Sequence, residues 1–203
     1  MTAIWYKHPK FYEFGMKIIH GKEFYKRFER ISRIIGKNKS VLDLGAGSFT
    51  LARFLDKSCS YEGWDLNKVF TKYYKKKGLN VKYKNCLDYK DYPIVDSITL
   101  IDILHHIGEK RGILIEKCLA HANNKLIICE PYKGKESRFY WFLVWLRQNL
   151  KLEKLIGDYD GINEQDYGYD IMKKNDLINF LRYYGDCKIV KKDMNIIAIY
   201  NKS

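Results

Sequence analysis

Residues 41–52, VLDLGAGSFTLA, constrain the fold more than any other stretch of this chain. A short apolar run with strand character leads directly into Gly45 and Gly47. Glycine has no β-carbon, so the backbone there can turn sharply and approach a ligand closely. A second strand-like run ends at Asp65, about 20 residues after Gly45, where a carboxylate accepts hydrogen bonds from ribose hydroxyls. This order of strand, glycine turn, strand and acid predicts a parallel sheet that holds an adenosine-type cofactor at its carboxyl edge.

Two departures from a dinucleotide-binding motif narrow the choice of cofactor. Thr50 stands where a third glycine or alanine would allow close packing of a helix against a pyrophosphate. Asp43 precedes Gly45 by two residues, and we expect its carboxylate to face the pocket. A negative charge there repels a pyrophosphate and attracts an ammonium or sulfonium group. A cationic, phosphate-free adenosine cofactor therefore fits better than NAD.

The segment Asp43–Gly47 resembles the first motif of the class I S-adenosylmethionine-dependent methyltransferases. The resemblance implies S-adenosylmethionine as the cofactor and S-adenosylhomocysteine as its product. It also implies a set of cofactor-binding residues on the glycine turn and at the end of the second strand: Asp43, Gly45, Ala46, Gly47, Asp65 and Leu66.

The hydrophobic pattern alternates between strands and helices over most of the chain, which predicts an α/β fold with a doubly wound, mostly parallel sheet. Residues 10–36 show helical spacing with a break near Gly21, and we expect two helices that cap the cofactor end of the sheet. The chain ends in two strands, which predicts an antiparallel hairpin and resembles the seven-stranded methyltransferase fold. The expected strands are 41–44, 61–64, 81–84, 97–101, 125–129, 188–191 and 196–200, and the expected helices between them are 48–55, 67–77, 109–122 and 173–184.

A length of 203 residues predicts one domain with a sizeable core. We divide it into an N-terminal helical cap (1–39), a cofactor-binding half (40–131), an insertion (132–172), and a C-terminal helix with the hairpin (173–203). The insertion contains an eight-residue apolar run, 139–146, followed by an acidic loop. Trp141 and Trp145 lie four residues apart, on one face of the predicted helix. We expect this helix to wall an apolar acceptor pocket, or else to be buried for stability alone, and the acidic loop to move when substrate enters.

Asn85, Cys86 and Asp88 follow the third strand, where the resembled family contacts adenine. An acid commonly closes this strand in that family, and the best-aligned position here is Asn85, whose amide oxygen accepts the same hydrogen bond. Asp88 is the other candidate, or else a turn residue. The backbone at Cys86 would contact the adenine ring.

Residues 102–107, DILHHI, follow the fourth strand and resemble a segment of small-molecule methyltransferases related to those of quinone biosynthesis. The resemblance places Asp102 near the methionine end of the cofactor. One histidine would lie near the acceptor as a general base or orienting group, and we expect His105 rather than His106 to face the pocket. The alternative is a histidine that packs against the sheet.

Glu130 ends the fifth strand, and two interpretations of it stay open. Its carboxylate would orient an acceptor hydroxyl or amine, or it belongs only to the loop that begins the aromatic helix. The N-terminal aromatic residues offer a similar choice between core packing and a lid with cation–π contact to the sulfonium. They are Trp5, Tyr6, Tyr12 and Tyr25.

The net charge of +13 is unevenly distributed. Residues 68–84 contain seven lysines and no acid, whereas residues 151–170 contain two lysines and six acids. A basic surface of this kind is either an ordinary solvated face or a site for nucleic acid, anionic lipid or an acidic substrate. The five cysteines show no C-x-x-C pairing, which predicts reduced thiols in a cytoplasmic protein and neither a zinc site nor any other metal site. We expect no signal peptide and no transmembrane segment.

These features favour an enzyme that transfers a methyl group from S-adenosylmethionine to a small or lipid-like acceptor. An RNA methyltransferase is the first alternative, because of the basic surface, although the sequence has no recognisable RNA-binding appendage. A non-catalytic module that retains the cofactor fold is the second. The identity of the acceptor and the oligomeric state do not follow from the sequence.

Overall fold

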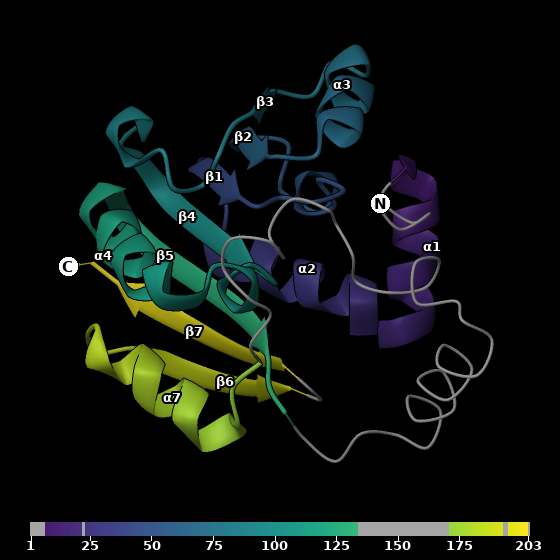
Figure 1. Ribbon diagram of the computed structural model, residues 1–203. Helices are drawn as coiled ribbons and strands as arrows, with labels where there is room; N and C mark the ends of the chain where they lie inside the picture. The colour runs from purple at the N-terminus through teal and green to yellow at the C-terminus, as the bar shows by residue number, and fades with distance from the viewer. Residues whose placement is uncertain (1–6, 22, 134–170, 193–194, 203) are drawn as a thin grey trace, which may run out of the picture.

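The computed structural model describes residues 7–21, 23–133, 171–192 and 195–202. A seven-stranded sheet with the order β3-β2-β1-β4-β5-β7-β6 lies between two layers of helices (Figure 1). Only β7 runs antiparallel to its neighbours, β5 and β6. The predicted doubly wound sheet with a terminal hairpin is therefore confirmed. The strands are β1 (Ser40–Leu44), β2 (Ser60–Asp65), β3 (Val81–Tyr83), β4 (Val95–Ile101), β5 (Ala122–Pro131), β6 (Lys188–Lys192) and β7 (Asn195–Asn201).

Alternation along the central strands sends side chains into two separate apolar layers. Leu42 and Leu44 of β1 pack on one face of the sheet, beneath the helices α4 and α7, whereas Val41 packs on the other face, beneath α2. Successive side chains of a strand point to opposite faces, so a buried strand must be apolar on both sides. The helices are α1 (Pro9–His20), α2 (Glu23–Ile35), α3 (Lys68–Lys76), α4 (Arg111–His121) and α7 (Lys174–Tyr183).

The two predicted N-terminal helices are present and separate at Gly21, whose φ of 57° ends α1. Helix α2 places Phe24, Phe28, Ile31 and Ile35 against the sheet, and none of these side chains is more than 7% exposed. The apolar spacing of three and four residues explains this packing, because it keeps one stripe of the helix on the core.

The helix predicted for residues 48–55 is wrong. The connection from β1 to β2 is described in full, and its helical content is a short 3₁₀ turn at Leu51–Arg53. Gly47 and Phe49 have positive φ values of 55° and 52°, which no right-handed helix accommodates. Leu51 of this turn packs in the same apolar layer as the side chains of α2.

Several sequence predictions fall outside the described residues. They concern Trp5, Tyr6, the aromatic helix with Trp141 and Trp145, and the acidic loop that follows it. Within the described residues, no helix is both long enough and apolar enough to cross a membrane. All five cysteines are free thiols, and four of them are buried.

Candidate functional site

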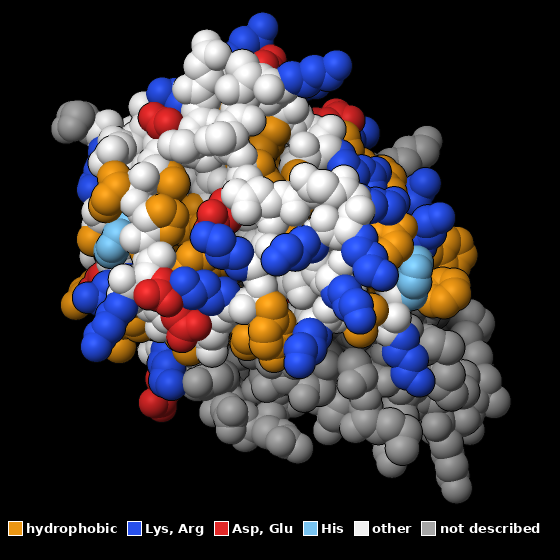
Figure 2. All heavy atoms as spheres, turned by 90° about the horizontal axis from the view of Figure 1, so that it is seen from above, with side chains coloured by type: hydrophobic (Ala, Val, Ile, Leu, Met, Phe, Trp, Pro, Cys, Tyr) orange, Lys and Arg blue, Asp and Glu red, His pale blue; other side chains and the backbone are white. Residues whose placement is uncertain are grey.

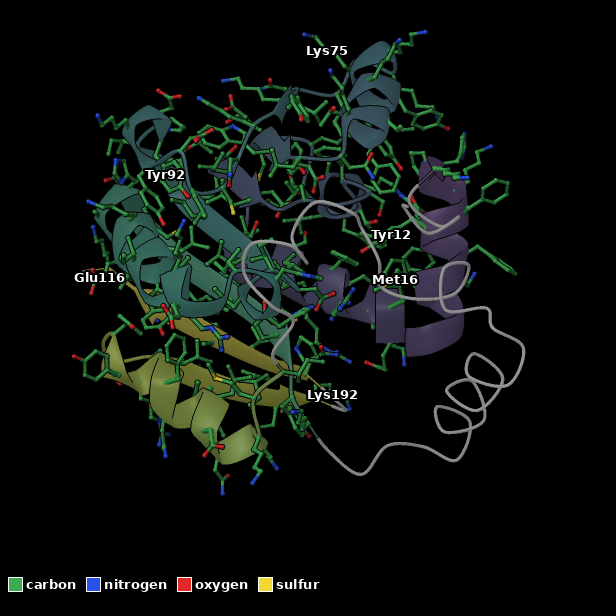
Figure 3. All side chains as sticks on the ribbon, viewed as in Figure 1. Tyr12, Met16, Lys75, Tyr92, Glu116 and Lys192 are labelled. Atoms are coloured by element: carbon green, nitrogen blue, oxygen red, sulfur yellow. The ribbon has the colours of Figure 1, made fainter. Side chains whose placement is uncertain are left out.

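A cleft opens at the carboxyl ends of β1, β2 and β4. Parallel strands bring their carboxyl ends to one edge, where the order β2-β1-β4 makes residues from distant parts of the chain neighbours. Figure 3 shows Tyr12 on the side of α1 that faces the sheet, so this helix contributes to the wall. The residues that line the cleft are Tyr12, Gly45, Gly47, Asp65, Leu66, Asn67, Phe70, Lys84, Asn85, Cys86, Asp102, Ile103 and His106.

The turn after β1 requires glycine at two positions. Gly45 and Gly47 have φ values of 65° and 55°, a conformation that other residues rarely adopt. A β-carbon on Gly45 would lie 2.6 Å from the Cδ1 atom of Ile103, which is too close for any real contact. The bare backbone of this turn therefore forms part of the floor of the cleft. Ala46 does not line the cleft and packs instead with the apolar cluster of Phe49.

The Asp65 carboxylate holds the turn after β1 and the turn after β2 in place. One carboxylate oxygen accepts a hydrogen bond from the backbone N–H of Gly47 at 2.7 Å, and the other accepts from that of Asn67 at 2.6 Å. A carboxylate oxygen can accept more than one hydrogen bond. This geometry suits a vicinal diol, such as that of a ribose.

Asp43 does not face the cleft, contrary to the sequence prediction. Its carboxylate is 2% exposed and accepts hydrogen bonds from the hydroxyls of Tyr61, at 2.9 Å, and Thr99, at 2.7 Å. Thr99 lies directly opposite Asp43 in the paired strand β4. Burial raises the pKa of Asp43 from its usual 3.8 to about 6, although both hydrogen bonds lower it. Burial also raises the pKa of Tyr61 well above its usual value, so this hydroxyl stays a donor.

The structure distinguishes the two candidates for the adenine contact that follow β3. Asn85 and Cys86 line the cleft, whereas Asp88 is exposed and outside it. The Asp88 carboxylate accepts a hydrogen bond from the backbone N–H of Asn85 at 3.2 Å, as a turn residue does. The Asn85 side-chain oxygen accepts from the backbone N–H of Leu87 at 2.9 Å, which fixes its position.

Asp102 lines the cleft and forms a buried ion pair with Arg27 of α2. The Arg27 Nη1 atom lies 2.5 Å from the Asp102 Oδ2 atom, and the two side chains are 4% and 15% exposed. The guanidinium carbon also lies 5.2 Å and 5.0 Å from the ring centroids of Phe24 and Phe28. The sequence analysis did not single out Arg27. The signal was a charged residue on the apolar stripe of a helix, a place where a charge needs a partner.

The two histidines lie in the reverse of the expected order. His106 lines the cleft, whereas His105 is 6% exposed and borders a second, smaller cavity with Glu130. Their rings lie 4.2 Å apart between centroids. One Glu130 oxygen accepts from the Nδ1 side of His105 at 2.7 Å, and the other accepts from the backbone N–H groups of Ile103 and Leu104, each at 2.7 Å. Glu130 therefore anchors the loop after β4 and does not line the cleft.

Comparison with known proteins supports this arrangement through structure alone. No protein-family model matches the sequence, and no curated protein matches it significantly. An O-methyltransferase family protein from Burkholderia thailandensis superposes with a TM-score of 0.65 and 13% identity, covering 96% of this chain and 59% of that chain. Magnesium protoporphyrin IX methyltransferase from Synechocystis PCC 6803, with bound S-adenosylhomocysteine, gives 0.61 and 14%, covering 93% and 86%. The chain has the fold of the class I methyltransferases.

A third structure with this methyltransferase fold contains both a substrate and a cofactor product. It is 1,6-didemethyltoxoflavin N1-methyltransferase from Burkholderia thailandensis, bound to 1,6-didemethyltoxoflavin and S-adenosylhomocysteine, with a TM-score of 0.59 and 14% identity. It covers 88% of this chain and 78% of that chain. The present chain spans 59% of the length of the first of these three structures.

Four residues of the cleft escaped the sequence analysis: Asn67, Phe70, Lys84 and Ile103. Asn67 had a readable signal, because its side-chain oxygen caps α3 by accepting from two backbone N–H groups, at 3.0 Å and 3.1 Å. The other three depend on where the tertiary fold places helix α3 and the segments that follow β3 and β4. Among the expected lid residues, Tyr12 lines the cleft, whereas Tyr25 packs beside the α2 cluster.

The buried Asp43 carboxyl predicts a distinctive pH dependence of stability. Its pKa is higher in the folded protein than its usual value, so the folded state loses stability as pH rises from about 4 to about 6. Asp43→Asn removes this titration and preserves the size of the side chain. The free energy of unfolding of the variant minus that of the natural protein should therefore increase by about 3 kcal/mol as the pH rises from about 3.5 to about 7.

Urea unfolding at a series of pH values measures this difference. Tyr61→Phe serves as the companion variant. It removes a donor that favours the ionised form and should move the midpoint of the titration to higher pH. A difference between Asp43→Asn and the natural protein that stays constant with pH would contradict the assignment.

Proposed function

We propose that this chain binds S-adenosylmethionine in the cleft and transfers its methyl group to a small or lipid-like acceptor. The proposal rests above all on one observation: the bare glycine turn, the Asp65 carboxylate and the His106 ring, from three different strand ends, converge on one cleft. The solved structures with this fold, two of which contain S-adenosylhomocysteine, support the choice of cofactor.

The residues of the cleft fit the chemical groups of such a cofactor. Asp65 would accept hydrogen bonds from the ribose hydroxyls, and the Asn85 amide would meet the adenine amino group. The turn at Gly45 and Gly47 would lie beneath the ribose and methionine portion. Asp102 would lie toward the methionine end, where its negative charge attracts a cation.

S-adenosylmethionine supplies, when bound, a methyl group on a positively charged sulfur. The chain's contribution is then to orient the acceptor, exclude water and remove a proton where the acceptor atom bears one. His106 is the titratable side chain suited to the last task, because it lines the cleft. Glu130 and His105 would support it indirectly, because their contacts fix the loop that carries His106.

The first prediction from the proposed function concerns cofactor affinity. Asp65→Ala removes an acceptor for charge-assisted hydrogen bonds that are each worth roughly 1.5–3 kcal/mol. The affinity for S-adenosylhomocysteine, measured by titration calorimetry, should fall at least about tenfold. Asp56→Ala is the matched control, because it removes the same charge from an exposed site where the carboxylate contacts Ser58. Unchanged binding by a folded Asp65→Ala protein would overturn the proposed cofactor site.

The second prediction separates the two candidates for the adenine contact. Asn85→Ala should weaken S-adenosylhomocysteine binding by about three- to tenfold, the worth of one ordinary hydrogen bond. Asp88→Ala should leave the affinity nearly unchanged, because that carboxylate lies outside the cleft. The same calorimetric titration measures both variants. A larger loss for Asp88→Ala than for Asn85→Ala would assign the adenine contact to Asp88.

The third prediction distinguishes the two histidines. His106→Ala should lower methyl transfer by about 10²- to 10⁴-fold, the usual contribution of a general base, while S-adenosylhomocysteine affinity is preserved. His105→Ala should instead lower the free energy of unfolding by about 1–3 kcal/mol, because the buried Glu130 loses a partner. The folded fraction of that variant should retain most of its activity, because Glu130 still holds the loop through the backbone N–H groups of Ile103 and Leu104.

The assay follows a labelled methyl group from S-adenosylmethionine into a metabolite and lipid extract and, in parallel, into total RNA. Thermal unfolding of each variant gives the folded fraction. Activity that survives in His106→Ala but disappears in fully folded His105→Ala would reverse the two roles. Label that enters RNA alone would replace the small or lipid-like acceptor with a nucleic acid.

A further inference from the structure

Helix α1 has two faces of different character. The inner face carries Tyr12, which lines the cleft, and Met16, which packs with the apolar cluster of α2. Figure 3 shows both side chains on the side of α1 that faces the sheet. Gly15, between them in sequence, is buried. These contacts fix the rotation of the helix about its axis, and so determine which residues face outward.

The outer face of α1 exposes two large aromatic side chains. Phe11 is 56% exposed and Phe14 is 60% exposed. They lie three residues apart, so they are neighbours on the helix surface. Lys10 directly precedes Phe11, Lys17 follows Phe14 by three residues, and both lysines are exposed. A helix with phenyl rings flanked by lysines on its open face is typical of segments that lie in the interface of a lipid bilayer.

The surface beside α1 is strongly basic. Helix α3 lies next to the beginning of α1, where the rings of His8 and Tyr73 meet with 5.2 Å between centroids. Figure 2 looks down on this side of the molecule and shows Lys and Arg side chains gathered over it, with hydrophobic side chains among them. Residues 68–84 contain seven lysines and no acid, and of these lysines Lys82 and Lys84 pair with Glu62 and Asp91. The exposed lysines on and just after α3 are Lys68, Lys72, Lys75, Lys76 and Lys77.

We propose that the outer face of α1 and the lysines of α3 form a docking surface for an anionic lipid bilayer. The lysines would meet lipid phosphates, each with an attraction that is significant within a Debye length of the surface. Phe11 and Phe14 would enter the boundary between head groups and acyl chains, where phenyl rings leave water. The phosphates of a nucleic acid would pair with the lysines equally well, but the two phenyl rings favour a bilayer over a nucleic acid.

This surface adjoins the candidate site, because Tyr12 of the same helix lines the cleft. Docking would therefore hold the cleft near the membrane, within reach of an acceptor dissolved in lipid. That consequence rests on the proposed methyl transfer, whereas the docking itself does not.

Vesicle co-sedimentation of the full chain tests the proposal. The two vesicle types are phosphatidylcholine alone and an equal mixture of phosphatidylcholine with phosphatidylglycerol. The chain should bind the mixed vesicles, and binding should weaken as salt is added. The double variant Phe11→Ser with Phe14→Ser should lose at least about tenfold in affinity, because two buried phenyl contacts are removed. Lys10→Glu with Lys17→Glu should lose at least about fivefold for each lysine.

Matched controls distinguish binding through this surface from nonspecific hydrophobic or electrostatic binding. Ile94→Ser with Ile113→Ser removes two apolar side chains that are 59% and 48% exposed elsewhere. Lys188→Glu with Lys191→Glu makes the same charge change on β6. Both controls should bind mixed vesicles nearly as the natural chain does. Thermal unfolding and S-adenosylhomocysteine titration confirm that each variant is folded, and a failure of the titration alone would contradict the proposed function without touching the docking.

Three outcomes would overturn the docking surface. The first is the absence of binding to the mixed vesicles. The second is an equal loss in the α1 variants and their controls, which would reduce the effect to net charge or general apolarity. The third is binding of a labelled RNA oligonucleotide without binding of the vesicles. In that case the affinity for RNA would fall in the lysine variants and stay unchanged in the phenylalanine variant. That result would assign the basic surface to nucleic acid.

Discussion

Four carboxylates, one from the end of each of four adjacent strands, hold together the edge of the sheet at which the cleft opens. They are Asp65 at the end of β2, Asp43 in β1, Asp102 after β4 and Glu130 in β5. A carboxylate that leaves water needs donors, since an unpaired buried charge is very unfavourable. Each of these groups finds its donors on a different segment and fixes that segment in place.

The partners of the four carboxylates determine the electrostatic character of the cleft. Asp43 and Glu130 turn away from it and are held by side-chain hydroxyls or by His105 and backbone N–H groups. Asp65 and Asp102 remain on its wall. The Arg27 guanidinium partly offsets the charge of Asp102, so α2 is an integral part of the site. A cation in the cleft would therefore meet the Asp65 carboxylate and a paired Asp102.

The sequence was sufficient for the features that depend on local pattern. Apolar alternation and turn residues gave the seven strands, and the spacing from Gly45 to Asp65 identified the edge at which the cleft opens. The surroundings of Asp43 could not be predicted in this way. Alternation with Leu42 and Leu44 places its side chain on the opposite face of the sheet from theirs. Its partners Tyr61 and Thr99, however, become visible only once the strand register is known.

The predictions for the two histidines and for a helix after β1 were wrong for a related reason. Whether His105 or His106 enters the cleft depends on the Glu130 anchor, a contact across 25 positions of the sequence. The β1–β2 connection turns through positive φ at Phe49, whose side chain is fully buried. A buried aromatic ring can compensate for an unfavourable backbone conformation, and no local propensity reports that balance.

Helix α1 shows how tertiary packing gives meaning to a pattern that is ambiguous in sequence. Phe11, Tyr12 and Phe14 are all aromatic and closely spaced, and their spacing predicts a helix without showing which of them pack against the body of the protein. Packing of Met16 and Tyr12 against the body of the protein uses only one side of the helix. The phenyl rings on the other side then have no place in the core. Helix α1 therefore contributes Tyr12 to the cleft and two exposed phenyl rings to the proposed docking surface.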